Sequence, residues 1–161
     1  MPTIGNNDVP QHYKAVDPDL DLEYYQDFFK SFFTNHKANK ERIDTLPNIL
    51  ATIQKGGWYN LDITPNLTII SLNTLWYDSY FGTPTQEAED QLKWLEYQLK
   101  RSLSEPNRKF IIMSHIHNNV SFWLNKEKHT RTLLNWNEEF FPLFNGKYND
   151  LMLKYKDVIY L

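Results

Sequence analysis

Two polar segments of the chain contain side chains that suit divalent-metal chemistry. The first is Gly5-Asn6-Asn7-Asp8. A glycine at its start allows a sharp turn with positive φ, after which the polar side chains can point at one centre. The oxygen of an Asn side chain is a hard, neutral ligand for a divalent cation. Taken alone the signal is weak, because such a segment is more often an ordinary turn.

The second segment is His115-Ile116-His117, which follows the apolar run 109–113. The pair stands in a loop after the strand, and only one of the two histidines is expected to face a given metal. A loop histidine is more often a hydrogen-bonded structural residue than a ligand, so this pair is also weak alone.

Helices and strands alternate around these segments. Aromatic residues at helical spacing predict a helix over 22–33, capped by Asp21. A second helix is expected over 42–54, stopping at Gly56-Gly57. Residues 57–62 and 67–72 then predict a hairpin.

The second half of the chain contains the clearest helix, over 85–103, with one apolar stripe formed by Ala88, Leu92, Leu95, Leu99 and Leu103. Residues 109–113 predict a buried strand. A helical region broken near Gly146 and a last strand over 157–161 follow. Residues 2–4 are expected to end a short strand.

This alternation predicts an α/β fold, with one domain over residues 1–161. Sites in such folds collect at strand ends. Loops 5–8 and 114–119 each follow a predicted strand, so we expect them to converge on one edge of the sheet.

Composition excludes several classes of function. The 161 residues carry a net charge of −3, so no bulk positive field attracts nucleic acid. Cysteine is absent, which excludes disulfides, thiolate metal sites and thiol nucleophiles. No apolar run is long enough for a transmembrane helix, and the first residues do not resemble a signal peptide. Asn66 and Asn119 begin sequons for N-glycosylation.

The order of five segments resembles the calcineurin-like metallophosphoesterases, specifically their acid sphingomyelinase-like branch. These segments are 2–9, 56–59, 67–75, 91–95 and 110–116, so the resemblance covers nearly the whole chain. Gly-Asn-Asn-Asp, with Asn where most relatives have His, is most similar to the vacuolar endopolyphosphatases.

The resemblance implies roles for particular residues. Asn6 and His115 correspond to metal ligands of the family. Asn7 takes the place of the histidine that usually contacts the phosphate and protonates the leaving group, which puts that acid in doubt. His117 and His12 are candidate substitute proton donors, and neither is favoured over the other.

The family holds two divalent metals, with zinc favoured, and Asn6 and His115 are too few ligands for such a pair. The resemblance therefore implies a portion of the metallophosphoesterase α/β sandwich, with mixed sheets flanked by helices. The Asp-x-His and Gly-Asp blocks are expected upstream of Met1, and the Gly-His-x-His block after Leu161.

Three interpretations follow. In the first, the chain is a fragment of a dinuclear-metal phosphoesterase that hydrolyses phosphodiester or phosphoanhydride bonds, in a lysosomal, vacuolar or secreted parent, and is inactive alone. In the second, it is a non-catalytic remnant that acts as a binding or assembly subunit, with a protein partner over its open sheet edges. The third is an unrelated α/β domain.

Overall fold

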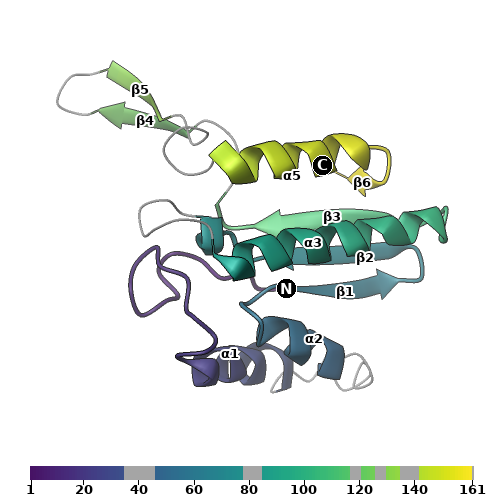
Figure 1. Ribbon diagram of the computed structural model, residues 1–161, viewed down its shortest axis with the longest axis horizontal. Coiled ribbons are helices and arrows are strands. Elements are labelled where there is room, and N and C mark those ends of the chain that lie inside the picture. The colour runs from purple at the N-terminus through teal and green to yellow at the C-terminus, as the bar shows by residue number, and fades with distance from the viewer. Residues whose placement is uncertain (35–45, 78–84, 117–120, 126–129, 135–141, 161) are drawn as a thin grey trace.

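The computed structural model describes residues 1–34, 46–77, 85–116, 121–125, 130–134 and 142–160 (Figure 1). Its centre is a four-stranded mixed sheet flanked by helices, so the predicted α/β fold class is confirmed. Helices α3 and α5 lie over one face of this sheet, while α1 and α2 lie beside its β1 edge (Figure 1).

The sheet has the strand order β1-β2-β3-β6. Strand β1 (Tyr59–Thr64) pairs antiparallel with β2 (Leu67–Leu72), which confirms the predicted hairpin. Strand β3 (Lys109–Ser114) runs parallel to β2, and β6 (Ile159–Tyr160) runs parallel to β3. The predicted last strand is thus present in shorter form.

A separate antiparallel pair, β4 (Ser121–Asn125) and β5 (Thr130–Leu134), was not predicted from the sequence. Both segments contain the aromatic or β-branched residues that favour strands, so a propensity signal was available.

Helix α3 (Gln86–Lys100) begins at Thr85, whose side chain caps the backbone N–H of Ala88. Four of the five predicted stripe residues are buried, but Leu103 is 77% exposed, so its place in the stripe is wrong. The chain tightens into the 3-10 turn η5 (Arg101–Leu103) after Lys100. A 3-10 helix has three residues per turn, whereas an α-helix has 3.6. This change of period rotates Leu103 away from the buried side of α3.

Helix α5 (Pro142–Lys154) continues through Gly146, so the predicted break is wrong. Glycine inside a helix costs only about 1 kcal/mol relative to alanine. Leu151 and Met152, later on the same helix, pack against the buried cluster under α3 and α5, and this burial outweighs the cost. None of the helices in the described ranges is both long and apolar enough to cross a membrane.

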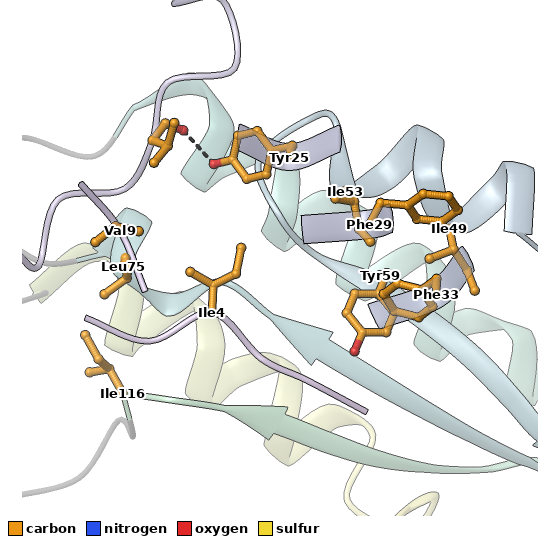
Figure 2. Close-up of a cluster of buried hydrophobic side chains, with 11 residues drawn as sticks. Ile4, Val9, Tyr25, Phe29, Phe33, Ile49, Ile53, Tyr59, Leu75 and Ile116 are labelled. Atoms are coloured by element: carbon orange, nitrogen blue, oxygen red, sulfur yellow. Dashed lines mark hydrogen bonds between the residues drawn. The ribbon is translucent and has the colours of Figure 1, made fainter. Parts of the chain in front are cut away.

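A second core lies beside β1 and joins the N-terminal region to the sheet (Figure 2). Helix α1 (Leu22–Phe29) is capped by Asp21 as predicted and runs into a π-helical turn, η1 (Lys30–Thr34). Helix α2 (Leu46–Ile53) is followed by Gly56 and Gly57, both with positive φ. The predicted end of this helix is confirmed, and its predicted start at 42 lies outside the described residues. Figure 2 shows the buried side chains Ile4, Val9, Tyr25, Phe29, Phe33, Ile49, Ile53, Tyr59, Leu75 and Ile116.

The segment before the first polar loop is not a strand, which corrects the prediction for residues 2–4. Its links to the sheet use side chains instead of a backbone ladder: Thr3 Oγ1 donates to the carbonyl of Leu72 over 3.1 Å. Ser71 Oγ and the Tyr59 hydroxyl both donate to the carbonyl of Pro2. Proline lacks the N–H that a ladder needs at this position.

A buried amide joins the end of β2 to α3. Gln91 is fully buried, and its Oε1 accepts from the Asn73 N–H over 2.7 Å. The Gln91 Nε2 donates back to the Asn73 carbonyl over 3.1 Å. One side chain thus satisfies both backbone groups of a residue that would otherwise lie unpaired in the core.

Replacing Gln91 by Leu should therefore lower the free energy of unfolding by about 2–4 kcal/mol, because it leaves two buried backbone groups without partners. Chemical denaturation of the variant measures this loss. Gln86→Leu, at an exposed position on the same helix, is the matched control and should change stability by less than about 0.5 kcal/mol. Equal stabilities for the two variants would contradict this account of Gln91.

Candidate functional site

Asn6 and His115, which lie 109 positions apart in the chain, meet at the end of β3. The Oδ1 atom of Asn6 lies 2.6 Å from Nε2 of His115. Asn6 is 9% exposed, whereas the His115 side chain is exposed. The two loops that were expected to converge thus do so at these residues.

Buried neighbours in the sequence fix both members of this pair. Ile4 and Val9 flank Asn6, Ile116 follows His115, and all three belong to the core beside β1 (Figure 2). The backbone N–H of Ile116 also donates to Oγ1 of the buried Thr74 over 2.9 Å. The packing of the core therefore sets where Asn6 and His115 lie.

Gly5 makes the close approach possible. A Cβ atom at this position would lie 3.0 Å from Nδ1 of His115 and 3.2 Å from Oδ2 of Asp8. Gly5 is not among the residues with positive φ, so the reason expected from the sequence is wrong. The glycine is needed for space and not for a left-handed backbone.

Asp8 and Tyr24 hold the outer side of this loop. The Asp8 carboxylate accepts from the Gly5 N–H over 2.9 Å, and the Asp8 carbonyl accepts from the Tyr24 hydroxyl over 3.1 Å. Burial, followed by the charges of Asp8 and Asp21, raises the pKa of Tyr24 to about 12. The phenol therefore stays protonated at physiological pH and continues to donate a hydrogen bond to the Asp8 carbonyl. No sequence pattern indicated this role of Tyr24, or that of Thr74.

His12 lies against the other end of the Asn6 amide. Its Nε2 atom is 2.7 Å from Asn6 Nδ2. The backbone turns back at Tyr13, which has φ 66° and whose N–H donates to the carbonyl of Asn6. The structure thus brings together three of the five predicted site residues: Asn6, His12 and His115.

The remaining predicted residues have different outcomes. Asn7 is exposed and follows Asn6 directly. His117 and the sequon residue Asn119 lie outside the described residues. Asn66 is exposed in the turn between β1 and β2. The roles of Asn7 and His117, and glycosylation at either sequon, stay predictions.

The donor atoms of Asn6 and His115 fit one divalent cation in part. An amide oxygen and an imidazole nitrogen are suitable ligands. At 2.6 Å a proton must lie between them, because two lone pairs would repel, whereas a bound cation would hold the two atoms further apart. Within the described ranges, no group of three His, Asp or Glu side chains is placed to hold a metal. The pair therefore supplies part of a coordination shell and not a complete dinuclear site.

The chain is similar to proteins named as an endopolyphosphatase and as phosphodiesterases. It is 31% identical over 124 residues to an endopolyphosphatase of Neurospora crassa, which covers 72% of this chain and 15% of that protein. It is 33% identical over 107 residues to the human cyclic GMP-AMP phosphodiesterase SMPDL3A, covering 64% of this chain and 23% of the relative. A sphingomyelinase phosphodiesterase D of Dictyostelium discoideum is 30% identical over 116 residues, covering 70% and 24%.

These relatives confirm the resemblance to the sphingomyelinase-like phosphodiesterases and endopolyphosphatases. The chain spans between 15% and 24% of their lengths. No family model matches it.

Gly5→Ala tests the packing of the site. The added methyl group should displace the His115 ring by a few tenths of an ångström and lengthen its contact with Asn6, while the core beside β1 stays folded. A crystal structure of the variant measures the Oδ1–Nε2 distance directly. An unchanged 2.6 Å contact would show that the glycine is not required.

Gly146→Ala is the matched control. Among the described residues, a Cβ at this position meets nothing within 4 Å, and Gly146 lies inside α5. This substitution should leave the site unchanged and stabilise the protein by about 0.5–1 kcal/mol through helix propensity.

Proposed function

We propose that this chain is the part of a metal-dependent phosphoesterase that supplies Asn6 and His115 to one metal ion. The observation that supports this most strongly is the 2.6 Å approach of two suitable ligand atoms across 109 positions of sequence. The similarity to enzymes named as endopolyphosphatase and phosphodiesterase supports the same class of reaction. The proposed reaction is hydrolysis of a phosphodiester or phosphoanhydride bond.

The complete protein would hold two divalent cations, with zinc favoured, and would take its other ligands from other parts of the protein. Such cations lower the pKa of bound water and stabilise negative charge on phosphoryl oxygens. Asn6 contributes a neutral ligand, so it does not reduce the positive charge at the site. His115 must give up its Nε2 proton to become a ligand, and Asn6 Oδ1 is the atom that faces that position.

Asn7 is the residue of this loop that we assign to substrate. It is exposed beside Asn6, where an amide N–H can donate to a phosphoryl oxygen. An amide cannot transfer a proton at neutral pH, so Asn7 cannot act as the acid for the leaving group. His117 and His12 remain the candidate donors for that step.

The alternative is a non-catalytic subunit that binds a partner, and one feature of the sheet favours it. Ile69, Ile111 and Tyr160 form a cross-strand row on the face opposite α3 and α5. Tyr160 is 56% exposed, and the other two are half-buried. A further layer of protein over this face would bury these side chains. For either function, we propose a lysosomal, vacuolar or secreted location.

Asn6→Ala and His115→Ala should each lower the turnover of a phosphodiester substrate by about 100-fold or more, because even outer partners of metal ligands contribute 10–100-fold. Circular dichroism and thermal unfolding should show an intact fold. The assay uses the complete protein that carries the other metal ligands, with added Zn²⁺.

Asn107→Ala is the control, because Asn107 is exposed in the turn before β3, at the opposite end of that strand from His115. Its turnover should match that of the unaltered protein. Activity within about threefold of normal in the Asn6 and His115 variants would exclude their roles as ligands. Absence of metal-dependent turnover in the unaltered protein would favour the non-catalytic alternative.

A further inference from the structure

We propose that His12 is a positioning residue that fixes the orientation of the Asn6 amide. Its Nε2 atom accepts a hydrogen bond from Asn6 Nδ2, so that Asn6 Oδ1 is presented to His115. The part of this proposal that concerns metal binding rests on the proposed function. The part that concerns the amide orientation does not.

The two ends of an Asn amide have nearly the same shape but opposite hydrogen-bonding character. Space alone therefore cannot decide which end faces His115. An imidazole nitrogen with a free lone pair can accept only from the NH₂ end, because two acceptors repel. At 2.7 Å, His12 Nε2 is close enough to impose this choice on Asn6, a residue that is only 9% exposed.

The local backbone is arranged to bring His12 to this position. Tyr13 has φ 66°, which is uncommon for a residue other than glycine and costly for a bulky one. Its backbone N–H donates to the Asn6 carbonyl over 3.4 Å, and the backbone N–H of Lys14 donates to the carbonyl of Gln11 over 2.9 Å. The rings of His12 and Tyr13 also meet edge to face, with centroids 4.4 Å apart. The loop thus closes around Asn6 from its outer side.

This geometry assigns opposite tautomers to the two histidines. His12 uses Nε2 as an acceptor, so the proton of its neutral ring lies on Nδ1. His115 faces an oxygen through Nε2, so its neutral ring carries the proton on Nε2 when no metal is bound. In this arrangement, Nε2 of His12 is occupied by Asn6, so a proton donated by His12 to a leaving group would come from Nδ1.

Nitrogen-15 NMR of the full chain without metal, at about pH 8.5 where free histidine is neutral, tests the tautomers. Two-bond couplings between ring nitrogens and carbon-bound protons distinguish Nδ1–H from Nε2–H, and single substitutions assign the signals. We expect Nδ1–H at His12 and Nε2–H at His115. A proton on Nε2 of His12 would overturn the proposal.

A matched pair of variants tests the positioning itself. His12→Gln places a carbonyl oxygen near the position of Nε2, whereas His12→Asn is too short to reach it. The Asn variant should speed hydrogen exchange of the Asn6 side-chain NH₂ by at least about tenfold and weaken Zn²⁺ binding by about 10–100-fold. The Gln variant should retain most of both properties. Zn²⁺ binding is measured on the complete protein that carries the other ligands, through the ring signals of His115.

Equal exchange and equal Zn²⁺ binding in both variants would overturn the positioning role. A different outcome separates it from the proposed function. If the tautomers and the Asn6 exchange behave as expected but Zn²⁺ leaves the His115 signals unchanged, the positioning role stands and the metal site fails.

Discussion

The space left by the missing side chain at Gly5 is the constraint on which the site depends. His115 comes so close that a Cβ would lie 3.0 Å from its ring. This approach lets Asn6 contact His115 through its oxygen and His12 through its nitrogen. A single amide thereby joins the N-terminal loop to the end of β3. The chemistry of the site follows from the orientation of that amide.

The hydrophobic core and the site are built from the same short segments. Ile4, Val9 and Ile116 are buried beside β1, and the polar residues between and next to them form the site. Burial of these apolar side chains supplies the free energy that holds the loops in place. Buried hydrogen bonds between Gln91 and Asn73, and between Thr74 and Ile116, then fix the backbone between β2 and the site. The positions of the two proposed metal ligands thus follow from the packing of neighbouring apolar side chains.

Local patterns predicted much of the fold, and the failures have identifiable physical causes. The Asp21 cap, the hairpin and most of the α3 stripe depend on residues near one another in sequence, so their patterns were sufficient. The predicted burial of Leu103 was wrong because a 3-10 turn changes the helical period. The predicted helix break at Gly146 was wrong because tertiary packing outweighs helix propensity. Asn6 and His115 were named through family resemblance. The contact of His12 with Asn6 depends on the positive φ of Tyr13, which no sequence pattern predicted.

The most direct test of the central claim is a crystal structure of the complete protein with Zn²⁺, using anomalous scattering to locate the metal. The account predicts a metal peak at about 2.0–2.2 Å from both Asn6 Oδ1 and His115 Nε2. It also predicts that His12 Nε2 still contacts Asn6 Nδ2. A metal bound elsewhere, with Asn6 and His115 still hydrogen-bonded to each other, would contradict the account.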